Sequence, residues 1–415
     1  MTLTNWAGNV RFRATEVATP STIDEVREIL SRPGKVRALG SGHSFNLIAD
    51  TDATLISTAK LTSAPVIDEE ARTVTVGAGT RYGELAPLLE QRGWALANLA
   101  SLPHITIAGS VATGTHGSGD GVGTLSSAVA GIELVTASGE VRNLRRGDRE
   151  FNGAVVSLGA LGIVTRITLD IEPSFEVTQR VFTKLPLETA LENFDAIMSA
   201  AYSVSMFLQW TDPDVVDQVW TKARDEQVPV LPGDPAAASE RMHPLAGVSA
   251  EACTEQLGLP GRWMDRLPHF RLDFTPSNGD ELQSELLVPR RNAVEAIRTL
   301  RTLADDIAPL IQVTEVRSMK ADKLWLSPAY QTDAIGLHFT WKQDQPAVEA
   351  VIAKIEGALA PFDPRPHWGK LSLAPVRDLA RVWPKLGDFA ALAREFDPEG
   401  RFRNDHLAFL DDLGR

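Results

Sequence analysis

A strand-like segment, residues 36–39, runs into Gly40-Ser41-Gly42-His43-Ser44, and this junction constrains the fold more than any other part of the sequence. Glycine tolerates positive φ and lets backbone N–H groups approach a ligand, as they do in loops that bind phosphate. A Rossmann loop would need a third glycine where Phe45 stands, and a P-loop would need Gly-Lys-Ser/Thr. The junction predicts a phosphate or pyrophosphate site outside these common nucleotide folds, although a plain tight turn could have the same sequence.

A second glycine-rich segment covers residues 101–119. Six glycines fall between Gly109 and Gly123, interleaved with Ser, Thr and His residues. A flexible Gly/Ser connector is one interpretation. However, the segment also holds apolar residues of the buried type, which connectors seldom contain: Ile105, Ile107, Ala108, Val111 and Ala112. These residues favour a backbone wrapped around a flat, polar ligand.

Length and composition exclude several classes of protein. A chain of 415 residues is long enough for two or three domains, and 43% hydrophobic with 23% charged residues is typical of a soluble globular protein. A net charge of −13 argues against nucleic acid or an anionic membrane as partner, and no stretch resembles a membrane span. Cys253 is the single cysteine, so the chain can form no internal disulfide, which fits a reducing cytoplasm. We expect Cys253 to have a structural role.

The first part of the chain, to about Pro173, mixes strand and helix signals. Thr22 or Ser21 caps an expected helix that runs to residue 31 before Pro33-Gly34. We expect strands at 36–39, 54–58, 73–77 and 161–171, a helix at 81–92, and a hairpin over 131–142 that turns at 138–139.

Longer helices mark the remainder. We expect helices at 187–200, 291–306 and 346–359, strands at 203–210, 311–318 and 335–342, and a helical tail from about 375 to 400. Residues 225–262 are rich in Pro, Ala and Gly, and form either a partly ordered excursion or a lid over a cleft.

Three strand-like segments carry polar pairs two residues apart, which alternation places on one face. They are Glu315 with Arg317, sharing their face with Ile311 and Val313; His338 with Thr340; and Gln283 with Glu285. Each of these pairs, taken alone, could lie on the solvent-exposed surface, for example as a surface ion pair. Together they predict a polar face in a site for a ligand rich in hydroxyl groups.

Lys370 stands in Pro366-His367-Trp368-Gly369-Lys370, where an apolar context favours a half-buried amine over a surface one and would lower its pKa. The sequence has no zinc-ligand spacing, no Gly-x-Ser-x-Gly and no Cys–His pairing, so it predicts no metal site and no hydrolase. Cationic and acidic groups beside glycine loops point to redox chemistry on an alcohol.

These segments, in this order, resemble the FAD-dependent vanillyl-alcohol oxidase family, and within it the bacterial alditol oxidases. The resemblance implies an α+β flavoprotein with a two-domain, PP-loop-type FAD-binding fold. Residues 1–174 would form the FAD-binding domain, and residues 375–415 a tail that returns to it. Residues 175–374 would form a cap domain that binds substrate, built on an antiparallel sheet flanked by helices.

The resemblance also implies the site residues. FAD, joined covalently to His43, would be bound by Gly40, Ser41, Gly42, His43, Ser44, Ser101, Thr106, Gly109, Ala112, Thr113, Gly114, Thr115, Val164 and His367. The substrate would be bound by Ser101, Gln283, Glu315, Arg317, His338, Thr340 and Lys370. Among these, Lys370, Arg317 and Glu315 would be catalytic.

The implied activity is oxidation of the terminal alcohol of polyols such as xylitol and sorbitol to the aldose, with O2 reduced to hydrogen peroxide. We expect a cytoplasmic monomer whose partners are a polyol and O2, not nucleic acid or membrane. Two alternatives stay open: an aldonolactone oxidoreductase of the same flavin fold, and a flavin- or sugar-binding protein without turnover.

Overall fold

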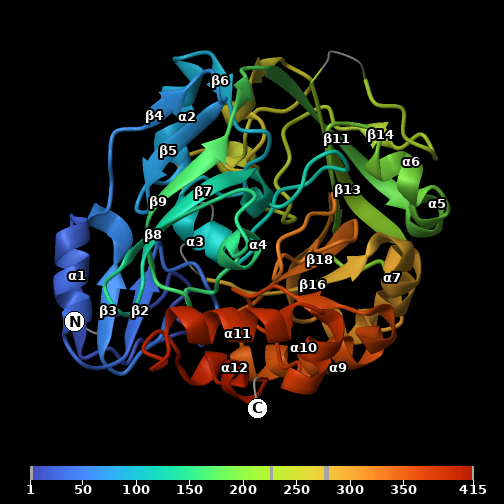
Figure 1. Cartoon of the computed structure of the whole chain (residues 1–415). Coiled ribbons are helices and arrows are strands. Elements are labelled where there is room, and N and C mark those ends of the chain that lie inside the picture. Colours follow the sequence, from blue (N-terminus) through green and yellow to red (C-terminus); the bar gives the residue numbers. More distant parts are fainter. Residues whose placement is uncertain (1–2, 225–227, 275–279, 414–415) are drawn as a thin grey trace.

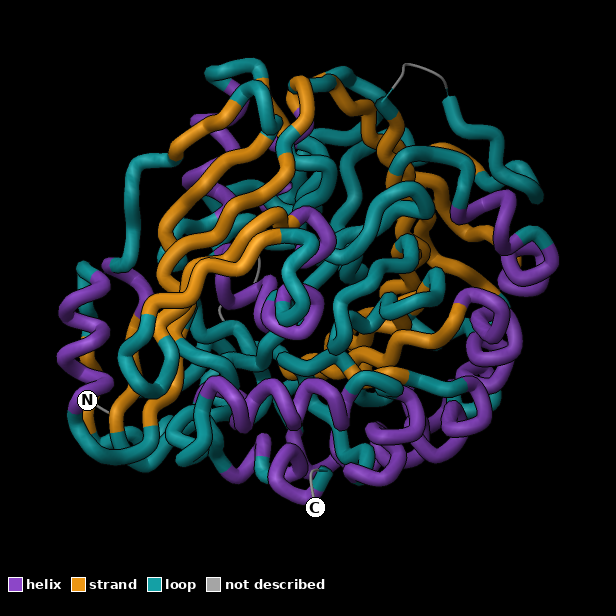
Figure 2. Tube along the Cα trace, viewed as in Figure 1, coloured by secondary structure: helices purple, strands orange, loops and turns teal. Residues whose placement is uncertain are grey.

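The computed structural model describes residues 3–224, 228–274 and 280–413. Figure 1 shows two β-rich halves side by side, with the C-terminal helices lying along the lower edge of the molecule. In Figure 2 the strands gather into two groups, and loops fill much of the space between them. No helix in the described ranges is long and apolar enough to cross a membrane.

The N-terminal half contains two main sheets. Its elements are β1 (Glu16–Ala18), α1 (Ile23–Ser31), β2 (Val36–Leu39), β3 (Thr54–Ser57), β4 (Val66–Asp68), β5 (Thr73–Gly77), α2 (Tyr82–Glu90), β6 (Trp94–Ala95), α3 (Ile107–Ala112), β7 (Val129–Val135), β8 (Val141–Arg145), α4 (Phe151–Ala154), β9 (Ile163–Asp170) and β10 (Glu172–Pro173). Strands β1, β3 and β2 pair in parallel. Strands β4, β5, β9, β7 and β8 form an antiparallel sheet in that order.

Local signals predicted α1, α2 and the strands β2, β3, β5, β7, β8 and β9 within a few residues, whereas β1, β4, β6, α3, α4 and β10 were not predicted. The Thr22 hydroxyl accepts a hydrogen bond from the Glu25 N–H and caps α1. The expected hairpin is β7 and β8, and its turn includes Gly139 at φ 80°. Strict alternation along β9 corresponds to alternating buried and half-buried side chains, because one face of that strand packs on the core.

The middle of the chain forms a nine-stranded sheet with helices on one face. Its elements are β11 (Glu176–Pro186), α5 (Leu187–Glu192), α6 (Phe194–Met198), β12 (Ser203–Leu208), β13 (Val215–Ala223), β14 (Ala236–Ala237), β15 (Gly261–Arg262), β16 (Leu282–Pro289), α7 (Ala293–Arg301), α8 (Ala304–Ile307), β17 (Ile311–Met319), β18 (Ala334–Trp341), α9 (Gln345–Leu359) and β19 (Arg365–Pro366). The order is β14-β11-β13-β12-β17-β18-β16-β19, and β15 pairs with β11. One face of the sheet shares a hydrophobic core with α5, α6, α7 and α9.

Three sequence expectations in this half need correction, and two long strands were missed. The helix expected at 187–200 is broken at Asn193, whose side-chain amide donates to the Thr189 carbonyl and competes with the helical backbone. The helix expected at 291–306 is interrupted between α7 and α8. Strands β11 and β13 were not predicted. The strand expected at 203–210 ends at Leu208.

Ile311 does not share a face with Glu315. A register shift between Ile311 and Val313 pairs Ile311 with Trp341 but Val313 with Thr340. Ile311 therefore lies in the core against the helices, whereas Val313 lies on the opposite face. The expectation was wrong because a β-bulge resets the alternation at that point.

The C-terminal tail contains α10 (Val376–Val382), α11 (Leu386–Phe396) and α12 (Phe409–Asp412). Its apolar residues share one hydrophobic core with the N-terminal half. Buried Arg37 joins the two, because its guanidinium donates to the carbonyls of Gly159 (2.9 Å) and Phe402 (2.5 Å). This packing agrees with the expectation that the tail returns to the N-terminal half. The domain boundaries at 174 and 374 stay predictions.

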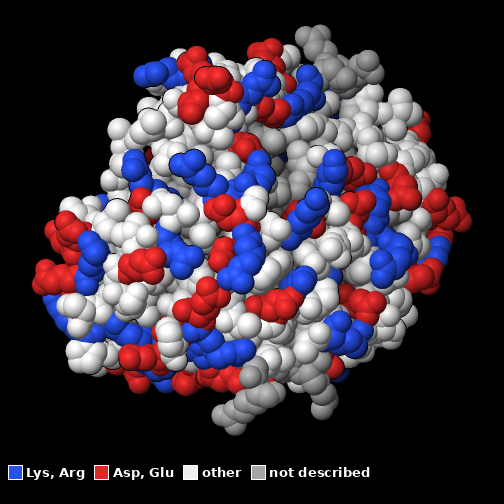
Figure 3. Space-filling model, in the orientation of Figure 1, with Lys and Arg blue, Asp and Glu red and all other residues white. Residues whose placement is uncertain are grey.

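Residues 228–262 are the described part of the Pro-rich excursion, and residues 225–227 lie outside the described ranges. His243, Pro244 and Leu245 of this segment line a cavity between the two halves. The segment thus covers part of that cavity, as a lid would. Figure 3 shows acidic and basic side chains interspersed over one face of the molecule, without a continuous basic patch there.

Candidate active site

A cavity of about 300 Å³ lies between the N-terminal half and the large sheet. The two glycine-rich loops contribute Gly40, Ser41, Gly42, His43, Ser44, Gly109, Ala112, Thr113 and Thr115. The large sheet and the segment after β19 contribute Gln283, Glu315, Arg317, His338, Thr340, His367 and Lys370. Ser101 and Val164 complete this set. Residues that the sequence placed in two separate groups thus line one continuous cavity.

The loop after β2 has the properties of an anion-binding site. The backbone N–H groups of residues 41–44 donate to no group within the described ranges. Gly42 has φ 70°, and a Cβ on Gly40 would lie 2.4 Å from the Thr106 hydroxyl, so neither position accepts a side chain without strain. Successive free N–H groups on such a turn fit the pyrophosphate of a dinucleotide such as FAD.

His43 is a neutral imidazole held in place at this loop. Burial lowers its pKa to about 4, and its ring stacks on Trp6 with centroids 5.1 Å apart. Because Nδ1 lies 3.1 Å from the Ser41 carbonyl, which can only accept, Nδ1 carries the proton. The free lone pair is then on Nε2, so the ring is in the uncharged state that a nucleophile requires.

The polar face of the large sheet consists of Gln283, Glu285, Glu315, Arg317, His338 and Thr340. Strand pairing sets them in rows: Glu315, His338 and Glu285 lie opposite one another across β17, β18 and β16. Thr340 and Gln283 form the next row, beside Val313. Directly opposite residues in antiparallel strands lie on the same face, so the expected polar face is confirmed.

Glu285 is the centre of this face, and although its spacing placed it there, the resemblance did not include it among the substrate-binding or catalytic residues. Its carboxylate is fully buried and contacts Lys370 Nζ at 2.6 Å, His116 Nε2 at 3.0 Å and Arg317 Nη2 at 3.3 Å. Burial opposes ionisation, yet the contacts with Lys370 and His116 outweigh it and hold the pKa of Glu285 well below its usual value. Gly336 leaves the room for this cluster, because a Cβ there would lie 2.9 Å from Glu285 Oε1.

Lys370 reaches the cavity from the segment that follows β19. Its Nζ donates to Glu285 Oε2 at 2.6 Å and to His338 Nδ1 at 2.7 Å. An ammonium has three protons, so one remains for a group in the cavity. Burial lowers the pKa of Lys370, and the Glu285 carboxylate opposes that shift.

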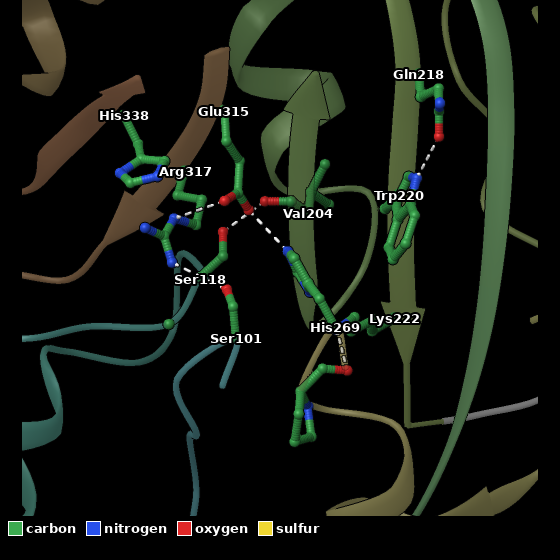
Figure 4. A network of polar contacts seen from close by, with 12 residues as sticks. Ser101, Ser118, Val204, Gln218, Trp220, Lys222, His269, Glu315, Arg317 and His338 are labelled. Atoms are coloured by element: carbon green, nitrogen blue, oxygen red, sulfur yellow. Dashed lines mark hydrogen bonds and ion pairs between the residues drawn. The ribbon is translucent and has the colours of Figure 1, made fainter. Parts of the chain in front are cut away.

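Arg317 and Glu315, both on β17, form a second charged pair on the polar face (Figure 4). The Arg317 guanidinium contacts Glu315 Oε2 at 3.5 Å and Ser101 Oγ at 3.5 Å. His269 Nε2 lies 2.8 Å from Glu315 Oε1. Burial opposes ionisation of Glu315, but Arg317 and His269 outweigh it and hold the pKa of this carboxyl well below its usual range. An ionised acceptor therefore faces the cavity beside a cation and a hydroxyl.

Two residues that the resemblance placed at the cofactor do not line the cavity. Thr106 is buried between Gly40 and Gly109, where its N–H donates to Ser41 Oγ and helps to hold the two loops together. Gly114 has φ 69° and lies against Pro328. His116 and His269 line the cavity but were not assigned, and no local pattern marked His269.

Two protein families match the segments that line this cavity. A family described as FAD binding domain matches residues 14–145, and one described as D-arabinono-1,4-lactone oxidase matches residues 280–410. The first match covers both glycine-rich loops, and the second covers the polar face and Lys370. FAD therefore fits both the family match and the free N–H groups of the loop.

Three relatives illustrate the range of similarity. The chain is 49% identical to an alditol oxidase from Streptomyces sp. over 99% of its own length and 98% of that protein. It is 28% identical to an L-gulono-1,4-lactone dehydrogenase from Mycobacterium tuberculosis over 97% of both chains. Cholesterol oxidase from B. sterolicum, at 14% identity, has the same fold with a TM-score of 0.77 over 99% of this chain and 96% of that one. The expected α+β flavoprotein fold is thus confirmed.

Proposed function

The chain belongs to the alditol oxidase family of FAD-dependent oxidoreductases, and on that premise we propose that it oxidises the terminal alcohol of polyols such as xylitol and sorbitol to the aldose. One observation supports this most: Ser101, Gln283, Glu315 and Thr340 line the same cavity as Arg317 and Lys370. The cations suit an alcohol that is losing its proton, and the remaining groups suit its further hydroxyls.

FAD bound at the glycine-rich loops would accept hydride from the carbinol carbon and pass the electrons to O2, which gives hydrogen peroxide. The residues of the chain do the remaining work. Lys370 and Arg317 stabilise the negative charge that develops on the substrate oxygen as its proton leaves. Lys370 also has a pKa lowered by burial, so we assign it as the proton acceptor.

Glu315 and Ser101 hold hydroxyl groups of the polyol beyond the reacting carbon, including ones that a simple 1,2-diol lacks. The Glu315 carboxylate accepts from hydroxyl groups, and Ser101 lies 3.5 Å from Arg317, at the same end of the cavity. Fixing these hydroxyl groups places the reacting carbon in one orientation, which lowers the entropic part of the barrier. Closure of the cavity by residues 243–245 would limit the access of water.

We expect covalent attachment of FAD through His43. The imidazole is neutral, is fixed by Trp6 and Ser41, and borders the cavity within the loop that carries the free N–H groups. Acid-precipitated protein should remain yellow, and the precipitated His43→Ala variant should release all its flavin. His104→Ala is a matched control, because His104 is half-buried and does not line the cavity. A colourless wild-type pellet would contradict the covalent bond.

Substrate length should have a large effect on turnover. Each neutral hydrogen bond contributes about 0.5–1.5 kcal/mol, so two further hydroxyls should raise kcat/KM about 10- to 100-fold. Peroxide release should thus be fast with xylitol and sorbitol, slow with glycerol and almost absent with ethanol. The Glu315→Gln variant should lose more activity with xylitol than with 1,2-propanediol. Faster oxidation of ethanol than of xylitol would contradict the assigned role of the polar face.

An aldonolactone oxidoreductase is the second candidate, since the D-arabinono-1,4-lactone oxidase family matches residues 280–410. Peroxide release from xylitol and from a 1,4-lactone, measured side by side, separates the two. A flavin-binding protein without turnover is a third possibility, and bleaching of the flavin by xylitol in the absence of O2 would eliminate it. We further propose that the protein is a monomer, because this one chain supplies every residue assigned to the site, and size-exclusion chromatography tests this. We also propose that it is cytoplasmic.

A further inference from the structure

A second layer of polar residues lies behind Glu315, and nothing in the proposed reaction uses it. His269 borders the cavity, while Lys222, on β13, is buried with 1% exposure. The contacts run from Lys222 Nζ to His269 Nδ1 (2.9 Å) and from His269 Nε2 to Glu315 Oε1 (2.8 Å). Figure 4 shows that Lys222 on β13, His269 in the segment between β15 and β16, and Glu315 on β17 point toward one another.

While Lys222 is an ammonium, the hydrogen bonds from Lys222 through His269 to Glu315 can have only one direction. Besides His269, Lys222 Nζ contacts the carbonyls of Leu267 (2.5 Å) and Pro268 (3.1 Å). An ammonium has three protons, and these three acceptors use all of them. His269 Nδ1 must then accept, so its single ring proton is on Nε2 and points at Glu315. Burial lowers the pKa of His269 to about 4, which agrees with a neutral ring.

The charges of Lys222 and Glu315 support one another. Burial lowers the pKa of Lys222 to about 7, and the Glu315 carboxylate is the largest influence that opposes this. The His269 ring packs against Phe207 and Trp220, with ring centroids 5.7 and 5.2 Å away, so it has little room to turn over. If Lys222 gave up its proton or were absent, His269 could carry its proton on Nδ1. Its bare Nε2 would then face the carboxylate, which is repulsive.

We propose that Lys222 and His269 are positioning residues that keep Glu315 ionised and oriented to accept hydrogen bonds from the hydroxyls of the substrate. Lys222 acts only through His269, and His269 only through Glu315. The pair thereby contributes to the preference for polyols over simple diols. This inference rests on the proposed function, because it explains why Glu315, one of the assigned substrate contacts, favours polyols over simple diols.

The decisive experiment is a double-mutant cycle on kcat/KM for xylitol. Lys222→Met keeps the apolar stem, and His269→Phe keeps an aromatic ring of similar size. Each should lower kcat/KM for xylitol about 10- to 100-fold, the range for a hydrogen bond to a charged group, and lower it much less for 1,2-propanediol. In a Glu315→Gln background, either change should lower kcat/KM for xylitol less than about threefold, because its target is gone.

Gln218→Leu is the matched control. Gln218 lies on the same strand as Lys222, accepts from Trp220 Nε1 at 2.8 Å and donates to the His243 carbonyl at 2.9 Å, so its loss also breaks buried hydrogen bonds. It should lower the melting temperature without changing the ratio of xylitol to 1,2-propanediol activity. A loss in Lys222→Met that is equal for both substrates, or that persists in full with Glu315→Gln, would overturn the proposal.

A readout without turnover separates this inference from the proposed function. NMR of protein labelled with ¹⁵N in its histidines should show His269 with its proton on Nε2, and this assignment should change in Lys222→Met. A wild-type His269 protonated on Nδ1 would overturn the inference, whatever the substrate is. Absence of peroxide from xylitol, with His269 protonated on Nε2, would instead refute the polyol oxidase activity and leave the Lys222–His269–Glu315 arrangement standing.

Discussion

Lys370→Met and Arg317→Met are each expected to lower kcat by about two orders of magnitude or more, the scale of a lost general base or alkoxide-stabilising group. Lys370 Nζ donates to Glu285 and His338, so its third position, a proton in the cation and a lone pair in the neutral amine, is left for the cavity, while Arg317 lies against Glu315 and Ser101. Methionine keeps most of each stem. The loss should therefore reflect the missing charge and donors more than a cavity in the protein.

Flavin content should be unchanged in both variants, because neither residue lies in the glycine-rich loops. Stopped-flow reduction of the flavin by xylitol without O2 measures the chemical step directly. If Lys370→Met reduces its flavin at nearly the wild-type rate, Lys370 is not the proton acceptor. Asn46→Ala is a useful control for this segment, since the Asn46 side chain donates to the Lys370 carbonyl and leaves the amine itself untouched.

The pH dependence of the same step distinguishes two roles of Lys370. As a proton acceptor it must be neutral, so flavin reduction should become faster as the pH rises through its pKa, which burial lowers from 10.5. As a cation that only stabilises the alkoxide, it would make reduction slower as the pH rises through the same value. We expect the first behaviour in the wild type and no such step in Lys370→Met.

The polar face could be predicted from sequence because strand alternation is a local property. Gln283 with Glu285, and His338 with Thr340, lie as their spacing indicated. Ile311 was placed on the wrong face because the β-bulge before Val313 depends on the pairing of β17 with β18, which no local pattern records. The glycine-rich loop at 40–44 was identified because the absence of side chains there is visible in the sequence itself.

The remaining site residues depend on contacts between distant segments. The spacing placed Glu285 on the polar face, but its hydrogen bond with His116 links two segments that are far apart in the chain, and no local pattern indicates such a contact. Lys222 and His269 carry no motif, and β13 itself was not predicted. Burial of a lysine is exceptional in general, so only the three-dimensional contacts could mark Lys222 as part of the site.

The Glu285 carboxylate is expected to have the largest effect on both stability and turnover. It is the acceptor shared by Lys370, Arg317 and His116, and its side chain is fully buried. Removing one partner of a buried ion pair costs about 3–5 kcal/mol, because the remaining charge is left without a counter-ion. Glu285→Leu should therefore unfold at a much lower temperature than the wild type, and Glu285→Gln, which keeps the shape and one acceptor, should lose less.

The acid side of the stability profile tests the same carboxylate. Its folded pKa lies well below 4.5, so its stabilisation is complete above the unfolded pKa and is lost as the pH falls towards the folded value. Thermal unfolding followed from neutral pH down to acid pH should show a shallower decrease for Glu285→Gln than for the wild type. In flavin reduction, the same variant should shift the Lys370 step to lower pH, because the carboxylate that raises this pKa is gone. A Glu285→Gln protein with an unchanged melting temperature and an unshifted pH profile would show that Lys370 and Arg317 do not depend on Glu285 for their charge.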